Sequence, residues 1–384
     1  MDFADAPEDA AFRSSVRDWL RATVPALCEP DGESLEERLT WRRRWQRELH
    51  SAGYAGLAWP REHGGRGATV LQQAIFAEEC GRAGAPEPIN AIGEAFAGPT
   101  LIAFGTDRQR ERFLAPILTG EEIWCQLFSE PGAGSDLAAL QTRAERDGDG
   151  WRISGQKVWT SRAHFADFAI LLARTSPAHP GERHKGITFF VLPMRQDGVK
   201  VRPLRHMLGE AEFNEVFLDG AYVPDDLVVG DVDGGWKVTM GTLAFERVAI
   251  ATGRVNITRL LDDLLEQVRG PVAEDPVVRR QVAELYGRGA LQQLTAKRIL
   301  SGIVSRGVPG PEASTAKLFA SPLVEDIADF AISLSGVAGQ ELGGAADRWL
   351  RLAYQARGTS IAGGTTFIQR NIVAERVLGL PRGN

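Results

Sequence analysis

The spacing of apolar residues divides the chain into three stretches. Up to about residue 122, apolar residues recur every three or four positions, which is the period of an α-helix with one buried face. Two sets of residues with this spacing are Phe12, Val16, Trp19, Leu20 and Val24, and then Leu39, Trp45 and Leu49. We therefore predict an α-helical N-terminal domain over residues 1–122.

The helical spacing disappears between about residues 123 and 235. Short runs rich in branched and aromatic residues, separated by Gly, Pro and Asp turns, predict β-strands at 168–172, 187–192 and 213–218. Helical spacing then returns in two sets, Val278, Val282 and Leu285, and Ala316, Ala320 and Val324. These patterns predict a middle β domain over 123–235 and a C-terminal helical bundle domain over 236–384.

Composition and charge indicate an ordinary soluble protein. The chain has 384 residues, of which 43% are hydrophobic and 24% charged, enough to form several packed layers. Its formal net charge of -6 argues against a nucleic-acid-binding surface. No apolar run approaches the roughly 20 residues that span a bilayer, and the acidic N-terminus lacks the apolar core of a signal peptide. We expect a cytoplasmic protein without a membrane span.

The cysteines and histidines do not have the spacing of metal ligands. The three cysteines are Cys28, Cys80 and Cys125, and we expect reduced, buried thiols. The six histidines are scattered along the chain. We expect no metal site.

Residues 124–161 carry the most specific signals of a ligand site. Within the run EPGAGSD at 130–136, two glycines stand where the backbone must approach something closely, such as a flat or anionic ligand. Ser135 and Asp136 follow, and they suit the cap of a helix or turn. The run DGDG at 147–150 predicts a hairpin that returns the chain to the run Trp159, Thr160 and Ser161. We therefore expect both segments to face one pocket.

This stretch resembles the signature of the acyl-CoA dehydrogenase family, flavoproteins that desaturate acyl-CoA thioesters. A distant second motif, GGTTFIQRN at 363–371 followed by a segment ending LGLPR, is similar to the family's C-terminal motif. The resemblance covers essentially the whole chain, and the two motifs stand in the family's order. It implies an α+β fold, acyl-CoA dehydrogenase-like, with an N-terminal helical domain, a middle β domain and a C-terminal helical bundle. The flavin would lie between the β domain and the bundle.

The resemblance also assigns residues to the FAD cofactor. A flavin ring needs hydrogen bonds at its polar edge and flat surfaces against its faces. Phe128 and Ser129 are expected at the pyrimidine edge, Trp159 against the ring, Ser161 near N5, and Ser135 at the CoA arm of the substrate. The implied cofactor-binding residues are Gln126, Leu127, Phe128, Ser129, Gly134, Ser135, Trp159, Thr160, Ser161, Thr365 and Phe367. Without the resemblance, Trp159 would be interpreted as a core aromatic and Ser129 as a turn residue.

The family's reaction requires a carboxylate base that removes the α-proton of the thioester. In many members this Glu immediately precedes the Gly-Thr pair of the C-terminal motif, but here that place is Gly363. A subset of the family carries the base on a helix just before an Arg, and the run LAFERV at 243–248 matches that segment. The resemblance therefore makes Glu246 the catalytic base. The alternative is a solvated Glu246 paired with a neighbouring Arg.

The thioester carbonyl is expected to keep a hydrogen bond from the backbone N–H of Gly363, alongside one from a flavin ribityl hydroxyl. Loss of the Glu side chain at that place need not remove the oxyanion site. The implied substrate-binding residues are Ser135, Glu246, Arg247, Gly363 and Gly364.

Two departures from the family concern a neighbouring subunit. Typical homotetrameric members hold the ADP end of the flavin with an Arg-x-Thr-Phe element and a Gln followed by paired glycines. No such element is present at 268–272, Ser333 stands for the Gln, and Val337 replaces one glycine. This combination resembles actinobacterial heteromeric acyl-CoA dehydrogenases, some of which desaturate steroid side-chain CoA thioesters. A homologous subunit in a heterotetramer is therefore expected, and a homo-oligomer stays open.

The leading hypothesis is FAD-dependent desaturation of an acyl-CoA, with a bulky or steroid side-chain substrate as one option, to trans-2-enoyl-CoA. The electrons would pass to electron-transfer flavoprotein. Two alternatives remain open. One is a flavin oxidase or monooxygenase on the same fold, and the other is a structural partner subunit that lends surface to another subunit's active site.

Overall fold

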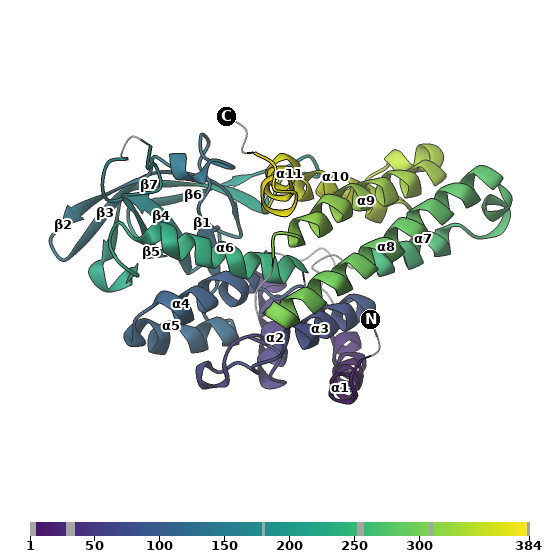
Figure 1. Ribbon diagram of the computed structural model, residues 1–384, viewed down its shortest axis with the longest axis horizontal. Helices are drawn as coiled ribbons and strands as arrows, with labels where there is room; N and C mark the ends of the chain where they lie inside the picture. Colours follow the sequence, from purple (N-terminus) through teal and green to yellow (C-terminus); the bar gives the residue numbers. More distant parts are fainter. Residues whose placement is uncertain (1–4, 28–34, 179–180, 252–256, 307–309, 382–384) are drawn as a thin grey trace. The chain divides into compact units, whose positions relative to one another are not determined.

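The chain folds as two compact units in the computed structural model (Figure 1). The structure describes residues 5–27, 35–178, 181–251, 257–306 and 310–381, with only the backbone described at 246–251. We call Pro25–Ala68 with Pro86–Glu246 the sheet unit. The helical unit comprises Met1–Val24, Thr69–Ala85 and Arg247–Asn384. The predicted α+β fold, with helices at both ends of the chain and strands in the middle, is confirmed. The boundaries of the three predicted domains stay a prediction.

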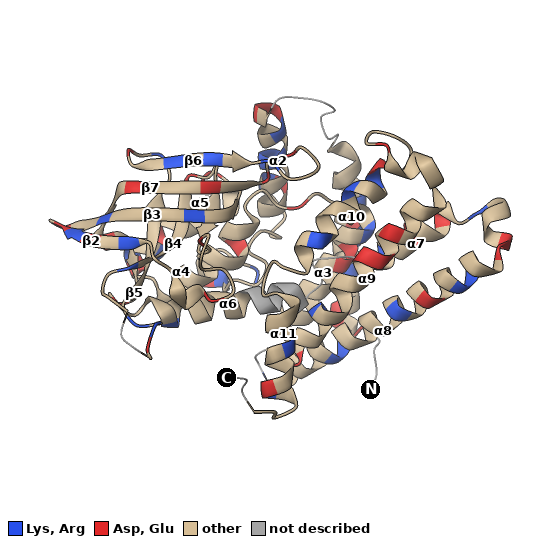
Figure 2. Ribbon diagram, turned by 90° about the horizontal axis from the view of Figure 1, so that it is seen from above, with Lys and Arg blue, Asp and Glu red and all other residues tan. Residues whose placement is uncertain are grey.

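The sheet unit contains an eight-stranded sheet in the order β6-β7-β3-β2-β4-β5-β8, with β1 paired to β4 off this path. Figure 2 shows β6, β7, β3 and β2 side by side. All three predicted strand runs are strands in the structure. The strands are β1 (Trp124–Leu127), β2 (Arg143–Asp147), β3 (Gly150–Ser161), β4 (Phe168–Arg174), β5 (Ile187–Pro193), β6 (Val199–Leu204), β7 (Phe213–Pro224) and β8 (Val228–Val229).

The predicted hairpin at 147–150 joins β2 to β3. Asp147 pairs with Gly150, and Gly148 between them has a positive φ of 60°, which glycine adopts without steric cost. The antiparallel pairing of β3 with β7 is interrupted twice, between Ile153 and Gly155 and between Lys157 and Thr160. Such irregularities redirect side chains locally, and the second one lies next to Trp159.

Helical elements of the sheet unit lie before, between and after the strands in the chain. Thr106 and Gln109 form a capping box at the start of α5, and Gln109 Nε2 also donates to the carbonyls of Asp226 and Val228 at 2.7 and 2.8 Å. The Gln109 side chain thus caps the start of α5 and also connects this helix to the backbone at β8. The helical elements are η1 (Val24–Ala26), α2 (Leu35–Ser51), η2 (Arg61–His63), η3 (Gly93–Ala97), α4 (Gly98–Phe104), α5 (Asp107–Thr119), η4 (Leu137–Ala139), η5 (Asp225–Leu227) and α6 (Gly235–Ala251).

The helical unit has its own apolar core, formed by residues such as Leu261, Leu285, Leu323, Ile327 and Trp349. Several of the apolar residues whose spacing predicted these helices are buried, including Val16, Leu20 and Val324. Its elements are α1 (Pro7–Thr23), α3 (Val70–Ala83), α7 (Ile257–Gln267), η6 (Gly270–Glu274), α8 (Pro276–Arg306), α9 (Ala313–Leu334), η7 (Gly336–Gln340), α10 (Asp347–Thr359), α11 (Thr366–Ile372) and η8 (Val373–Val377).

Cys80 and Cys125 are free thiols, as predicted, although only Cys125 is fully buried. Burial raises the pKa of Cys80 to about 12 and also raises the pKa of Cys125. Cys28 lies outside the described residues. Among the described helices, none is both long and apolar enough to cross a membrane.

Glu94 joins three segments of the sheet unit. It lies in the π-helical turn η3, where Oε1 accepts a hydrogen bond from Gln46 Nε2 at 2.5 Å and Oε2 accepts one from Gly56 N at 2.7 Å. Its carbonyl accepts from Trp59 Nε1 at 2.8 Å. Burial raises the pKa of the Glu94 carboxyl to about 7, because desolvation outweighs both hydrogen bonds to the charged form.

We predict that Glu94 makes stability fall as pH rises between about 4.5 and 7. In that window the folded protein keeps a proton that the unfolded chain has released, so the free energy of unfolding decreases with pH. Urea unfolding across this window should show the fall, and Glu94→Gln should flatten it while costing some stability at low pH. The exposed Glu62→Gln is the control. An unchanged slope in Glu94→Gln would contradict the prediction.

Candidate functional site

The two segments assigned to the flavin ring lie side by side at one end of β1 and β3. Val158 N donates to the carbonyl of Ser129 at 2.9 Å. Lys157 Nζ donates to the carbonyl of Phe128 at 3.1 Å and to Glu130 Oε1 at 2.8 Å. The turn after β1 is therefore fixed to the last residues of β3 through both backbone and side-chain contacts.

Lys157 and Glu130 form a buried ion pair that the sequence reasoning did not identify. Lys157 is fully buried, and Glu130 is 7% exposed. The Glu130 carboxylate also accepts from the backbone N–H groups of Gln141 and Thr142, at 2.6 and 3.0 Å. These contacts satisfy the charges, which would otherwise be costly to bury. The sequence did carry an indication of this burial. Side chains alternate between the two faces of a strand, and Lys157, four residues after the buried Ile153, falls on the same face.

Both members of the pair are ionised at neutral pH. Burial acts to raise the pKa of Glu130, but the charge and hydrogen bond of Lys157, together with the hydrogen bonds from Thr142 and Gln141, hold the pKa below its ordinary value. Burial lowers the pKa of Lys157 to about 8, and the Glu130 carboxylate limits that fall. The pair is therefore a fixed ionic contact between the two ring segments.

Trp159 is presented to solvent by a strained backbone. Its side chain is 64% exposed, and its φ of 60° lies in the left-handed region that bulky residues avoid. Its ring meets Phe213 edge-on, with centroids 6.1 Å apart. The alternative of an ordinary core aromatic does not describe this side chain. Next to it, Thr160 is buried and Ser161 is half-buried.

The run 130–136 forms a tight, open turn. Glu130 and Ala133 exchange two backbone hydrogen bonds of 3.1 Å. A Cβ built on Gly132 or Gly134 would meet nothing within 4 Å, so this backbone is accessible to a close ligand. Ser135 is exposed. Asp136 is the N-cap residue of η4, but its side chain makes no capping hydrogen bond, and its carboxylate pairs with Arg183 at 2.5 Å instead.

Only part of the predicted flavin set has an exposed side chain in this region. Leu127 and Phe128 are buried in the core, so they can reach a ligand only through their backbone. Gln126 and Ser129 are half-buried. An exposed flat indole beside accessible backbone and a glycine turn fits a planar heterocycle with a phosphate-bearing arm. The residues present therefore fit a flavin.

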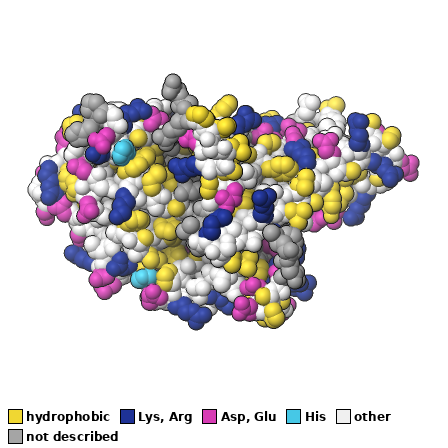
Figure 3. Space-filling model, in the orientation of Figure 1, with side chains coloured by type: hydrophobic (Ala, Val, Ile, Leu, Met, Phe, Trp, Pro, Cys, Tyr) yellow, Lys and Arg dark blue, Asp and Glu magenta, His cyan; other side chains and the backbone are white. Residues whose placement is uncertain are grey.

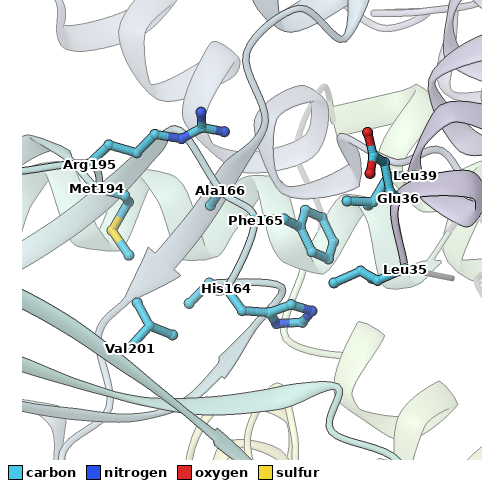
Figure 4. Close-up of a pocket in the computed structure, with 10 residues that line it drawn as sticks. Leu35, Glu36, Leu39, His164, Phe165, Ala166, Met194, Arg195 and Val201 are labelled. Carbon is cyan, nitrogen blue, oxygen red and sulfur yellow. The ribbon is translucent and has the colours of Figure 1, made fainter.

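A separate pocket of about 440 Å³ lies beside the loop that follows Ser161. Figure 4 shows His164 and Phe165 pointing toward Leu35 of α2. Burial lowers the pKa of His164, despite an opposing interaction with Asn214. No predicted flavin residue lines this pocket. Its lining residues are Leu35, Glu36, Leu39, Ala163, His164, Phe165, Ala166, Met194, Arg195 and Val201.

The C-terminal motif begins as a short loop at 363–365 in the helical unit and continues into α11. Gly363 and Gly364 have φ values of 62° and 90°, which glycine alone adopts readily. Thr365 caps α11, because its hydroxyl accepts from Ile368 N at 3.3 Å. Phe367 is exposed, at 73% of its surface. The hydroxyl of Thr365 thus accepts one hydrogen bond within the chain, which leaves its O–H able to donate.

Two further predictions fall on the helices. Glu246 and Arg247 belong to α6, but their side chains lie outside the described residues, so the candidate base stays a prediction. In α9, the Ser333 hydroxyl donates to the carbonyl of Phe330 at 2.7 Å. Val337 in η7 is 87% exposed. Among the described residues, no cluster of His, Cys, Asp and Glu could hold a metal ion.

Comparison with protein families accounts for nearly the whole chain. The family model described as acyl-CoA dehydrogenase, N-terminal domain, matches residues 6–121. The model of the middle domain matches residues 125–221, and that of the C-terminal domain matches residues 233–378.

Relatives and solved structures agree with this match. The chain is 42% identical over 382 residues to acyl-CoA dehydrogenase IpdE1 of Mycobacterium tuberculosis, with 97% of each chain covered. It is 41% identical over 391 residues to IpdE1 of Mycolicibacterium smegmatis, again with 97% of each covered.

Among solved structures, the Tcur3481-Tcur3483 steroid ACAD superposes with a TM-score of 0.87 at 30% identity, covering 100% of both chains. The ChsE4-ChsE5 complex from Mycobacterium tuberculosis gives a TM-score of 0.83 at 28% identity, also over 100% of both chains. With all three domain models matched in order and full-length relatives above 40% identity, the chain belongs to the acyl-CoA dehydrogenase family.

Proposed function

We propose that this chain is the FAD-binding, catalytic subunit of a dehydrogenase that converts an acyl-CoA thioester to its trans-2-enoyl-CoA. The observation that carries this proposal is the junction of the two ring segments. Val158 and Lys157 fix the turn at 128–130 next to Trp159, which leaves a flat, exposed aromatic surface beside accessible backbone. FAD, when bound, supplies the acceptor for the hydride that leaves the β-carbon.

Glu246 is the proposed base for the α-proton. The place before Gly364, where many family members carry the base, is Gly363 and has no side chain. A carboxylate at 246 would receive the α-proton, and burial by substrate would bring its pKa closer to working pH. The backbone N–H of Gly363 would donate to the thioester oxygen and stabilise the negative charge that develops there.

A bulky, steroid-type acyl group is the substrate class that the relatives favour. One structure that is similar over the full chain is that of a steroid ACAD. Electron-transfer flavoprotein is the proposed electron acceptor. The oxidase alternative makes a different prediction, because substrate-reduced flavin would then react rapidly with dioxygen.

A homologous subunit is the proposed partner. Two similar structures are named as pairs of chains, Tcur3481-Tcur3483 and ChsE4-ChsE5. Figure 3 shows apolar side chains at the surface over the helices of the helical unit, as is common for faces that other subunits cover. On α8 the exposed apolar residues are Val277, Tyr286, Leu291, Leu294 and Val304.

For Glu246→Gln, we expect the fold and the bound flavin to be retained, because the change is nearly isosteric. Turnover should fall by about 100-fold to 10,000-fold, the usual effect of losing a positioned general base. Stopped-flow reduction of the flavin by the acyl-CoA substrate measures this directly, with Glu284→Gln on the exposed side of α8 as the control. Near-normal flavin reduction in Glu246→Gln would remove Glu246 from the role of base.

Trp159→Ala should weaken FAD binding by about 1–3 kcal/mol, because a large flat contact is lost. The flavin absorbance spectrum should change as well, and Trp159→Phe should fall between the two. Met207→Ala removes another exposed apolar side chain of the sheet unit and serves as the control. FAD affinity and spectrum both equal to the parent's would show that Trp159 is not part of the ring site.

The chain expressed alone should bind little FAD, whereas the complex with its homologous partner should hold about one flavin per pair of chains. The reason is that Ser333 and Val337 replace residues that family members contribute to a neighbour's flavin. Solution mass and FAD per chain measure both states. The double change Ser333→Gln with Val337→Gly should raise FAD occupancy of the single chain. Full occupancy and activity of the unaltered chain by itself would reject an obligate partner.

A further inference from the structure

The loop Ala362 to Gly364 is held by its carbonyl groups. Lys317 Nζ, from α9, donates to the carbonyl of Ala362 and to that of Gly364, the latter at 2.6 Å. Gln369 Nε2, from α11, donates to the carbonyls of Gly363 and Gly364 at 3.1 and 3.3 Å. Three successive carbonyls are therefore bound by two side chains that approach from two different helices.

The N–H groups of the same loop are left available. In the described part of the chain, neither Gly363 N nor Gly364 N has a recorded hydrogen-bond acceptor. Both residues have positive φ, a backbone conformation that residues other than glycine rarely adopt. Successive backbone N–H groups in such turns bind anions and carbonyl oxygens. The loop thus has bound acceptors and available donors.

Two glycines in succession cannot fix this conformation by themselves. Glycine has the largest conformational freedom of any residue, so an unrestrained Gly-Gly loop would sample many orientations of its N–H groups. The start of the loop is anchored through Ser360, whose hydroxyl donates to Glu325 at 2.6 Å and whose carbonyl accepts from Thr366 N at 3.1 Å. The peptides of Gly363 and Gly364 themselves are restrained by Lys317 and Gln369.

We propose that Lys317 is a positioning residue for the thioester, with Gln369 as its neutral counterpart. By binding the carbonyls of Ala362 and Gly364, the ammonium group keeps the loop's N–H groups directed at the thioester oxygen. This inference rests on the proposed function, because it assigns to Gly363 N–H the contact with that oxygen. We assign Lys317 no direct contact with the substrate or the flavin. Its effect is exerted through the backbone of the loop.

The contact with the thioester oxygen becomes stronger as negative charge develops there, so misdirected N–H groups cost more in the transition state than in the substrate complex. Lys317→Met keeps the apolar stem but removes the donors. In the FAD-loaded complex it should lower kcat by about 10-fold to 100-fold and leave KM nearly unchanged. Lys317→Arg should restore most of kcat. Lys200→Met, on an exposed part of β6, is the matched control and should behave as the parent.

A spectroscopic readout separates positioning from general stability. A conjugated arylacryloyl-CoA absorbs at longer wavelength when its carbonyl oxygen accepts hydrogen bonds, so its spectrum reports on the loop's donors. The red shift on binding should be present in the parent, in Lys317→Arg and in Glu246→Gln, and should be largely lost in Lys317→Met. FAD content is measured in all four proteins, so that their spectra are compared at equal flavin occupancy.

Gln369→Met tests the same loop from the other helix and should give a smaller loss of the red shift. If Lys317→Met does not fold, Gln369→Met is the variant that tests the proposal. A full red shift with kcat within about twofold of the parent, in whichever of the two variants folds, overturns the proposal. If Glu246→Gln remains active while Lys317→Met loses the red shift, the assignment of the base fails and the positioning role stands.

Discussion

The ion pair between Lys157 and Glu130 lies in the core of the sheet unit, and the shape of the proposed ring-binding surface depends on it. One ammonium group binds both the carbonyl of Phe128 and the Glu130 carboxylate, which in turn holds the backbone at Gln141 and Thr142. Breaking such a pair would leave a buried charge without a partner, which is strongly unfavourable. The turn after β1 is thereby fixed to β3.

That rigidity explains how the strained backbone at Trp159 persists. A positive φ at a bulky residue is retained only where the surrounding structure determines it, and here the preceding residues are held by Lys157 and by the hydrogen bond from Val158. The irregular pairing of β3 with β7 between Lys157 and Thr160 redirects the indole outward. Buried charge and exposed aromatic surface are therefore two consequences of one local arrangement.

The helical unit uses the same chemistry at its own loop. Lys317 binds the backbone carbonyls of Ala362 and Gly364, and this leaves the backbone N–H groups of the two glycines as donors. In each unit a lysine ammonium group binds backbone carbonyl oxygen of a turn: Lys157 binds that of Phe128, and Lys317 binds those of Ala362 and Gly364. The other side of each turn is then available to face a ligand. Lys157 and Lys317 thus determine the geometry of backbone groups that we propose as contacts of the ligand.

The sequence by itself determined the helical and β-rich stretches, the hairpin at 147–150 and the two family motifs, because local periodicity and turn chemistry depend on neighbouring residues. Through the family resemblance it also assigned Trp159 to the flavin ring and placed Gly363 where many members carry the catalytic base. Only the tertiary structure decided which side chains of the ring motif are buried, as for Leu127 and Phe128, and that Asp136 pairs with Arg183. It alone revealed Lys157 with Glu130, and Lys317 with the glycine loop, because these contacts join residues distant along the chain.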